Sequence, residues 1–125
     1  MEDKVLYKEL SYRVIGAAMT VHKELGPGFP EAIYDEAFGI ALRSVQIPFE
    51  PQKEFAVAFS GIVLKKTFKP DYDVEEKIIV ELKAKGEIPK EDEATLLAYL
   101  RASKRRLGIL INFGRPSLEY KRLLL

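Results

Sequence analysis

The residues most suited to chemistry lie in one stretch, KPDYDVEEKIIVELKAKG, at positions 69–86. Asp71 and Glu81 stand ten residues apart, and Lys83 follows Glu81 at a spacing of two. On a β-strand this spacing places Glu81 and Lys83 on one face of the sheet. Two carboxylates that converge at the end of a sheet suit Mg²⁺ or Mn²⁺. A lysine beside them completes the groups needed for metal-assisted phosphodiester hydrolysis.

A structural interpretation of the same residues is also open. Glu-x-Lys on a strand is a common exposed ion pair that contributes little to stability, and Asp after Pro occurs in many turns. The functional interpretation gains from the context, because the two acids bracket an apolar run at 78–80 that is typical of a central strand. Unpaired charges beside a buried strand cost free energy, so their presence there favours a function.

The spacing of apolar residues predicts an alternation of helices and strands. The expected elements are helices at 10–25 and 31–45, strands at 49–59, 62–72 and 77–84, a helix at 90–106 and a strand at 107–113. Ser60-Gly61 suits a hairpin turn between the first two strands, and Pro70 breaks or edges the second one. The tail at 118–125 fits either a strand or a helix.

This order, α-α-β-β-β-α-β, predicts an α/β domain with a mixed central sheet covered by helices. A chain of 125 residues matches one domain, residues 1–125, and can bury a single core. Because there is no cysteine and only one histidine, the sequence excludes disulfides, thiolate metal sites and zinc sites built on several histidines. That histidine, His22, has no evident partner and is expected to be solvated or to cap its helix.

Four blocks of the sequence, in order, resemble a known family. Pro70-Asp71 followed by Glu81-Leu82-Lys83 looks like the core motif of the PD-(D/E)XK nucleases. GPGFPEAIY reads G-x-x-E-x-x-Y, and LLAYLRASKRRLGILINFG resembles the end block of the GxxExxY proteins, a branch of that superfamily. The resemblance covers roughly residues 8–123 and implies a restriction-endonuclease-like core.

The resemblance implies a role for each matching residue of the core motif. Asp71 and Glu81 would be the principal metal ligands, and the backbone carbonyl of Leu82 would complete the shell. Glu31 would be the acid on the first core helix, turned toward the metal. Lys83 would contact the attacking water or the scissile phosphate.

Gly28, Tyr34 and Thr95 would support the site by the same resemblance. Tyr34 lies one helical turn beyond Glu31 and would either support it or pack. The sequence departs from the family at Thr95, because the family carries His-Glu-Ala-Gln where this chain reads Asp-Glu-Ala-Thr at 92–95. Threonine is shorter than glutamine by two heavy atoms and cannot span the same gap. Metal binding is therefore expected, and efficient catalysis is left open.

Two clusters of basic residues are suited to contact phosphates. The first precedes Asp71 and the second ends the late helix; the clusters are Lys65, Lys66 and Lys69, and Arg101, Lys104, Arg105 and Arg106. Solvation is the alternative, with compensation of the helix dipole as a further reason for the second cluster. The sequence does not show whether either cluster shares a face with the acids.

Several wider expectations follow from composition. The formal charge of +1 is not typical of a chain that grips nucleic acid over its whole surface, but it permits a local basic patch. No apolar run approaches the ~20 residues of a membrane span, and MEDKVLYKEL is too charged for a signal peptide, so we expect a cytoplasmic protein without a membrane partner. The three leucines that end the sequence, at 123–125, form a leucine tail that is expected to pack on its own domain or on a neighbouring subunit. The frequent dimers of the superfamily imply a homo-oligomer, such as a dimer.

Two functions from different classes are consistent with the sequence. The first is a nuclease that uses Mg²⁺ or Mn²⁺ to hydrolyse phosphodiester bonds of nucleic acid, with DNA preferred to RNA as the expected partner. The second is a catalytically weak or inactive protein of the same fold that serves as a nucleic-acid-binding or self-assembling structural module. Thr95, the near-neutral charge and the leucine tail favour the second.

Overall fold

A computed structural model describes residues 6–125. Residues 1–5, part of the segment used above against a signal peptide, lie outside the described residues. In chain order the elements are α1 (Lys8–Leu25), α2 (Glu31–Ser44), β1 (Phe49–Pro51), β2 (Phe55–Phe59), β3 (Ile62–Phe68), β4 (Tyr72–Val74), β5 (Ile78–Lys83), α3 (Lys90–Ser103), β6 (Leu107–Asn112) and β7 (Glu119–Leu124). No helix within residues 6–125 combines the length and the apolar composition that a membrane span requires.

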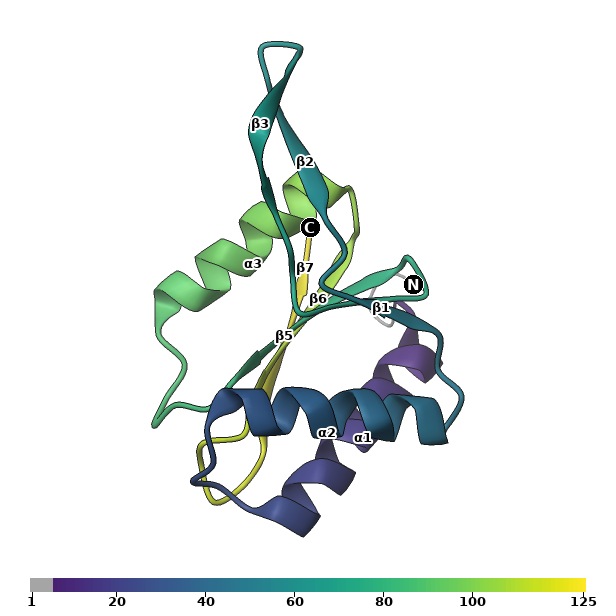
Figure 1. The fold of residues 1–125 in the computed structure, drawn as a ribbon, viewed down its shortest axis with the longest axis vertical. Coiled ribbons are helices and arrows are strands. Elements are labelled where there is room, and N and C mark those ends of the chain that lie inside the picture. The colour runs from purple at the N-terminus through teal and green to yellow at the C-terminus, as the bar shows by residue number, and fades with distance from the viewer. Residues whose placement is uncertain (1–5) are drawn as a thin grey trace.

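A five-stranded sheet in the order β1-β4-β5-β6-β7 runs through the centre of the molecule (Figure 1). β5 and β6 are parallel, and the other neighbouring pairs are antiparallel. A parallel pair needs a crossover connection, which α3 supplies on one face of the sheet. The mixed sheet between helices confirms the predicted fold class, and β5 is the central strand, as expected.

Alternation along β5 divides the core into two parts. Ile78, Val80 and Leu82 pack with residues of α1 and α2, whereas Ile79 packs with residues of α3. Figure 1 accordingly shows α1 and α2 on one side of the sheet and α3 on the other. Because both faces of β5 are covered, the run at 78–80 is apolar without alternation.

The two long strands expected at 49–59 and 62–72 are each interrupted. Their outer parts, β1 and β4, join the main sheet, while β2 and β3 pair only with each other in the described structure and project from it (Figure 1). Gln52 adopts a φ of 55° directly after Pro51, and Pro70 lacks the N–H that would continue a ladder. Five strands therefore precede α3 where three were predicted, although the turn at Ser60-Gly61 is as expected.

The structure also defines where the late helix ends and what the C-terminal tail forms. α3 ends at Ser103, because Lys104 takes a left-handed φ of 64°, so Arg105 and Arg106 lie beyond it and not inside a helix at 90–106. The tail forms the edge strand β7, and Leu123 packs on the second core of the same chain.

His22 is not solvated, contrary to the prediction. The side chain is buried at the end of α1, and its Nε2 lies 2.8 Å from the carbonyl oxygen of Arg115. Its ring also stacks on Phe113, with the centroids 6.2 Å apart. The partner comes from the other end of the chain, which is why no local pattern predicted it.

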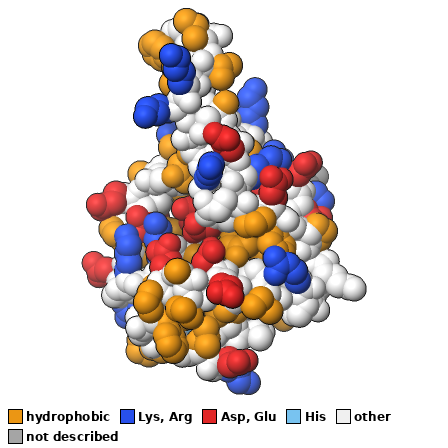
Figure 2. All heavy atoms as spheres, in the orientation of Figure 1, with side chains coloured by type: hydrophobic (Ala, Val, Ile, Leu, Met, Phe, Trp, Pro, Cys, Tyr) orange, Lys and Arg blue, Asp and Glu red, His pale blue; other side chains and the backbone are white. Residues whose placement is uncertain are grey.

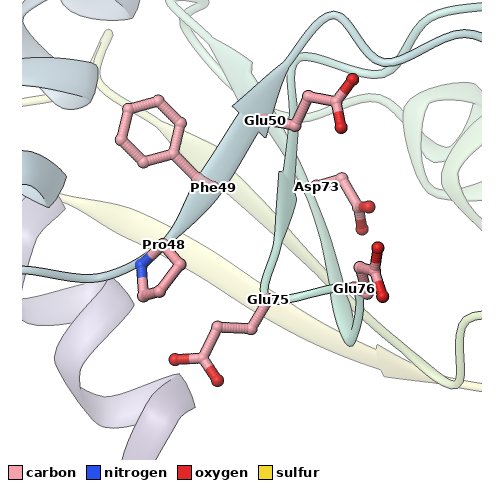
Figure 3. Close-up of a pocket in the computed structure, with 6 residues that line it drawn as sticks. All are labelled: Pro48, Phe49, Glu50, Asp73, Glu75 and Glu76. Carbon is pink, nitrogen blue, oxygen red and sulfur yellow. The ribbon is translucent and has the colours of Figure 1, made fainter.

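A concave acidic surface lies at the outer edge of the sheet, where β1 meets the turn between β4 and β5 (Figure 3). It is lined by Pro48, Phe49, Glu50, Asp73, Glu75 and Glu76. Figure 3 shows that Glu75 points away from Asp73 and Glu76. Asp71 and Glu81 are not among the lining residues, so this surface is separate from the predicted catalytic acids.

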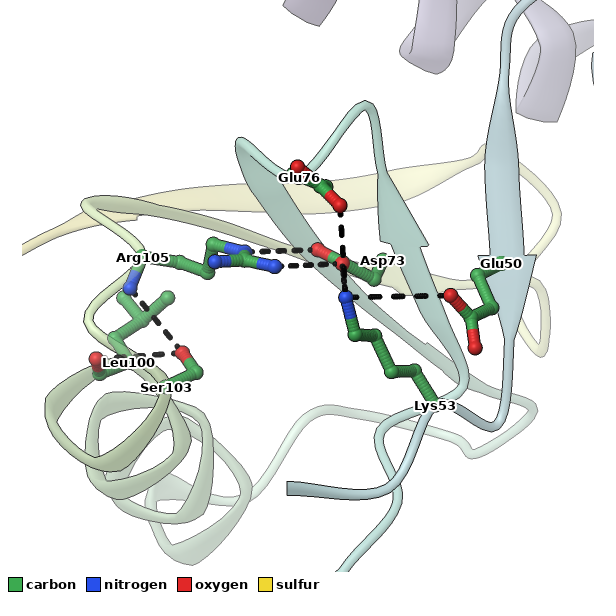
Figure 4. Close-up of polar contacts among 7 residues, drawn as sticks. All are labelled: Glu50, Lys53, Asp73, Glu76, Leu100, Ser103 and Arg105. Atoms are coloured by element: carbon green, nitrogen blue, oxygen red, sulfur yellow. Dashed lines mark hydrogen bonds and ion pairs between the residues drawn. The ribbon is translucent and has the colours of Figure 1, made fainter. Parts of the chain in front are cut away.

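Asp73 is the charged centre of a network on the α3 side of β4 (Figure 4). Its side chain is 2% exposed, and Arg105 donates hydrogen bonds to both of its carboxylate oxygens, at 3.0 and 2.8 Å. The Lys53 ammonium lies 3.6 Å from the same carboxylate. Both cations also lie over the Phe55 ring. The network therefore joins the end of α3 and the start of β2 to the main sheet.

Replacing Asp73 by Ala should lower the free energy of unfolding by about 3 kcal/mol, because it leaves two cations beside a buried strand without their carboxylate. Urea unfolding followed by circular dichroism measures the change. Glu76→Ala is the matched control, since Glu76 also pairs with Lys53, at 3.8 Å, but its side chain is 78% exposed. The control should cost less than about 1 kcal/mol. Equal effects of the two substitutions would contradict a structural role for the network.

Candidate active site

Asp71 and Glu81 face each other at the point where β4 and β5 separate. The backbone N–H of Asp71 donates to the Glu81 Oε2 at 2.7 Å. The backbone N–H of Leu82 donates to the Asp71 Oδ2, also at 2.7 Å. Each carboxylate is thus held by the backbone of the opposite chain segment, and the two acids predicted to meet lie side by side.

Pro70 explains why the ladder ends here. The β4–β5 register pairs Tyr72 with Val80, which places Pro70 opposite Leu82. The Leu82 N–H turns toward β4, and in a strand the carbonyl of a residue points to the same side as its N–H. Proline has no N–H to donate to that carbonyl. Pro70 therefore cannot supply the ladder hydrogen bond that the Leu82 carbonyl would otherwise accept.

Glu81 and Lys83 lie on the α3 face of the sheet. Val80 and Leu82 point to the opposite side, into the core formed with α1 and α2. The predicted division of this strand into a charged and an apolar face is therefore confirmed. The hydrogen bond from the Phe113 N–H to the Lys83 carbonyl, at 2.8 Å, continues the pairing with the β6 side up to the end of β5.

The two acids are electrostatically strained. Burial and the neighbouring Asp71 carboxylate raise the pKa of Glu81 from 4.5 to about 8. Burial also raises the pKa of Asp71, although the Leu82 N–H, the Lys83 ammonium and the Gln52 side chain oppose this. Like charges that cannot move apart favour a bound proton or a bound cation. A pair of carboxylates with raised pKa values is typical of a functional site.

Glu31 belongs to the same electrostatic group. It is exposed in the first turn of α2, and burial and the Asp71 carboxylate raise its pKa, while Lys83 and Lys85 lower it. The backbone that leads to it is fixed by Tyr34, whose hydroxyl donates to the Gly26 carbonyl and accepts from the Phe29 N–H.

Tyr34 is fully buried and stacks on Phe113 with the ring centroids 4.7 Å apart. Tyr34 therefore packs in the core and holds the loop that precedes α2, while a supporting role toward Glu31 stays a prediction. Gly28 lies inside the loop that Tyr34 holds and adopts a φ of 113°, a conformation that L side chains rarely take.

Helix α3 contributes residues that the sequence analysis did not assign. The Asp92 carboxylate lies 2.8 Å from the Lys85 ammonium and 4.0 Å from that of Lys83. Burial and the charges of Glu81 and Asp71 raise the pKa of Tyr99, which places its hydroxyl near the acids. Thr95 is exposed between them on this helix. Asp92 and Tyr99 are seven residues apart, or about two helical turns, and Thr95 lies between them. This spacing could have predicted that both residues share the helix face of Thr95.

Gln52 and Asp35 also lie near Asp71, and the sequence did not predict either of them as part of the site. Gln52 donates its backbone N–H to the Asp71 carbonyl, at 3.1 Å, and its side chain opposes the rise in the pKa of the Asp71 carboxyl. Burial and Asp71 raise the pKa of Asp35 on α2. Both residues lie far from Asp71 in the sequence, so no local spacing pointed to them.

Asn112 and Gly114 fix the chain directly after Lys83. The buried Asn112 side chain accepts the Lys85 N–H at 2.9 Å and donates to the Lys85 carbonyl at 3.0 Å. A Cβ at position 114 would lie 2.3 Å from the Lys85 carbonyl oxygen, so only glycine fits. The INFG segment of the end block thus acts as a clamp on the end of β5.

The predicted phosphate contacts lie in different surroundings. Lys65 and Lys66 are exposed on β3, and Lys69 is exposed just before Asp71. Arg101 and Lys104 are exposed near the end of α3. Arg105 differs, because its guanidinium is already bound by the buried Asp73 carboxylate. A phosphate contact of Arg105 stays a prediction, and the described structure gives this side chain a structural partner.

The donor atoms at this site are oxygens, the ligand type that hard divalent cations prefer. Two carboxylates and a backbone carbonyl suit Mg²⁺, which commonly binds one or two protein carboxylates and keeps several waters. Within residues 6–125, however, no three His, Cys, Asp or Glu side chains are arranged as a metal site. Glu31 is therefore a neighbour of the Asp71–Glu81 pair and not the third member of a preformed cluster.

The comparisons with known proteins agree with this geometry. Residues 8–123 match the sequence profile of the PD-(D/E)XK nuclease superfamily, so the chain belongs to that superfamily. The fold is similar to that in the crystal structure of SSO0001, with a TM-score of 0.61 and 18% identity over 74% of this chain. The match covers 48% of that protein, so this chain spans about half its length, and at this identity the likeness concerns the fold alone. A comparison with curated proteins gives no match.

The free energy of unfolding of the metal-free protein should fall as pH rises from 4.5 to about 8. Over this range Glu81 keeps its proton in the folded state and has lost it in the unfolded state. The folded state then binds more protons, so stability falls with pH, by about 1 kcal/mol per pH unit. Urea unfolding in EDTA across this pH range measures the slope.

Glu81→Gln keeps an acceptor oxygen for the Asp71 N–H and removes the ionisation. This variant should be more stable than the wild type at the upper end of the range and should show a weaker pH dependence. Glu87→Gln, at an exposed position, is the control and should follow the wild type. Identical slopes for the wild type and Glu81→Gln would contradict the raised pKa.

Proposed function

We propose that this chain is a metal-dependent nuclease that hydrolyses phosphodiester bonds of DNA or RNA. The observation that carries the proposal is the Asp71–Glu81 pair, held by reciprocal backbone hydrogen bonds beside Lys83 in a chain of the PD-(D/E)XK nuclease superfamily. The alternative of an ordinary surface ion pair is less consistent with two carboxylates that face each other and carry raised pKa values.

Mg²⁺ or Mn²⁺ is the proposed cofactor. Asp71 and Glu81 would hold it, together with the Leu82 carbonyl, to which Pro70 cannot donate a ladder hydrogen bond. Glu31 would contribute through its charge or through a water. When bound, such a cation supplies the Lewis acid and the activated water that phosphodiester hydrolysis needs.

The other residues have positioning and electrostatic tasks. The Lys83 ammonium, on the same face as Glu81, would contact the attacking water or a phosphate oxygen and offset developing negative charge. Asp92 holds Lys85 and lies near Lys83, so it would orient both cations. The Asn112 clamp keeps the end of β5 in place, which limits the freedom of Lys83.

We also propose that the chain belongs to the GxxExxY branch. The structural support is that Gly28, Glu31 and Tyr34 act as one unit. Tyr34 anchors the loop that contains Gly28, and that loop sets the start of the helix that bears Glu31. DNA as the preferred substrate, a homo-oligomeric state and a cytoplasmic location stay predictions of the sequence analysis.

Thr95 favours the second candidate function, a weakly active or inactive protein that binds nucleic acid or assembles with itself. It is exposed on α3 between Asp92 and Tyr99, where a longer side chain would reach toward the acids. A binding role would need the fold and the basic residues but not the full catalytic group.

Metal-dependent cleavage should disappear when Glu81 is replaced by Gln. Fluorescently labelled single-stranded, duplex and branched DNA, and RNA, are incubated with Mg²⁺, Mn²⁺ or EDTA. Loss of one metal ligand should reduce the rate on the order of 10²-fold or more. Glu76→Gln, an exposed acid at the other end of β5, should keep wild-type activity. Equal metal-dependent cleavage by Glu81→Gln and the wild type would refute the assigned role.

Thr95→Gln should raise the cleavage rate if the short side chain limits catalysis. The added amide can hydrogen-bond Lys83 or the substrate, and we expect an increase of about tenfold, typical of one well-placed hydrogen bond. Thr95→Met is the matched control, since it has a similar length and no amide. The interpretation fails if the glutamine variant is no faster than the methionine variant.

A further inference from the structure

The hairpin formed by β2 and β3, which we term the arm (residues 55–68), has no task in the proposed chemistry. It projects from the main sheet, as Figure 1 shows. Its end is apolar and open to solvent, with Phe59 69%, Ile62 66% and Val63 67% exposed. Phe59 and Ile62 are paired across the strands, so their side chains lie next to each other on one face of the arm.

The arm and the segment that follows it carry only positive charge. Residues 55–70 contain no Asp or Glu, and they include Lys65, Lys66 and Lys69. Figure 2 shows blue and orange side chains on the projecting part, whereas red side chains gather on the body beneath it. A segment that combines exposed apolar side chains with cations is complementary to nucleic acid, which offers base faces and phosphates.

The base of the arm is rigidly attached beside the catalytic acids. The Phe68 ring stacks on Phe55 at 5.4 Å and on Tyr99 of α3 at 4.4 Å between centroids. Lys53 and Arg105 lie over the outer ring of this stack and are bound in turn by Asp73 (Figure 4). The chain then runs from Phe68 directly to Asp71. The base of the arm therefore lies next to the acid pair. The tip stands about 20 Å farther out, because a strand rises about 3.3 Å per residue between Phe68 and Ile62. A nucleic acid bound along the arm would thus lead to the acid pair.

A second copy of this chain is the other occupant to consider. The outer edges of β2 and β3 are unpaired in the described structure, and such edges can pair with another strand. However, Lys65 and Lys66 lie on β3, and pairing two arms would bring like charges together. Lysines on an edge strand oppose this pairing, while they favour a polyanion. The charges of the arm thus favour nucleic acid.

We propose that the arm binds nucleic acid with exposed bases, such as single strands or the unpaired ends of a splayed duplex. This inference rests on the proposed nuclease function and names its substrate class. Phe59 and Ile62 pack on a base face, and Lys66, on the same face of β3 as Ile62, contacts an adjoining phosphate. Lys65, on the opposite face, and Lys69, beyond the strand, contact phosphates farther along the nucleic acid. Exposed bases are preferred to a continuous duplex, because no base step has to be opened before Phe59 can stack.

The test measures binding by fluorescence anisotropy in EDTA, so that cleavage does not interfere. The probes are one DNA sequence as a single strand, as a splayed duplex and as a blunt duplex, and the same single strand as RNA. Phe59→Ser combined with Ile62→Ser should weaken binding to the single strand and the splayed duplex at least fivefold and to the blunt duplex less than twofold. Ile40→Ser, at a site 57% exposed on α2, is the matched control and should change none of the affinities.

The lysines give an independent readout. Lys65→Ala with Lys66→Ala should weaken binding to all probes and should reduce the slope of log K against log salt by about 1.4 on the single strand, as expected for two lost phosphate contacts. Lys23→Ala, at an exposed position on α1, is the control and should leave the slope unchanged. Circular dichroism checks that each variant is folded.

Three outcomes separate this inference from the nuclease proposal. If arm variants bind and cleave every probe as the wild type does, the arm proposal is overturned and the nuclease proposal stands. If the wild type shows arm-dependent binding but no metal-dependent cleavage, the arm proposal stands and the nuclease proposal falls. If the tip substitutions convert a dimer to a monomer in analytical ultracentrifugation without loss of DNA affinity, the arm is a self-association surface and the proposal is overturned.

Discussion

The candidate site depends on one electrostatic constraint, because the backbone holds two carboxylates near each other at the end of the β4–β5 ladder. Asp71 and Glu81 cannot separate, because each accepts a hydrogen bond from the backbone of the opposite segment. Burial raises the pKa of both groups, and the Asp71 charge raises that of Glu81 further. Such an arrangement costs stability in the absence of a proton or a cation.

Asp73, by contrast, is a buried carboxylate whose charge is compensated by neighbouring cations. It stands within β4, two residues after Asp71, which immediately precedes that strand, and it is more deeply buried. Arg105 and Lys53 neutralise it and tie α3 and the arm to the sheet. Within residues 6–125, no arginine binds Asp71 in this bidentate way. Asp73 thus stabilises the fold, whereas Asp71, two residues earlier, belongs to the candidate site.

The surrounding elements keep the acid pair in place from three directions. Tyr34 and Phe113 stack between the first helices and the end of β6, which sets the entry into α2 near Glu31. Asn112 holds the chain after β5. The crossover through α3 brings Asp92 and Tyr99 over the charged face of β5. Each of these contacts joins segments that are distant in the sequence.

The sequence by itself determined the fold class, the central place of β5 and the face on which Glu81 and Lys83 lie. These features follow from local patterns, namely strand alternation, helical spacing and turn residues, which act over a few positions. Pro70 was recognised as a break, but its consequence was not, since a missing N–H matters only once the opposite strand is known. The missing donor opposite the Leu82 carbonyl therefore became evident only from the β4–β5 register.

Only the tertiary structure decided which charges are compensated. Arg105, for which the sequence left phosphate contact and solvation open, is bound by Asp73. His22, expected to be solvated or to cap its helix, is buried against Arg115, and the two long strands were each divided. Gln52, Asp35 and Asp92 join the site from separate elements. Electrostatic energies depend on distance and burial in space, and neither quantity is encoded in local spacing. Pattern therefore specified the elements, and their packing specified which side chains remain available for chemistry.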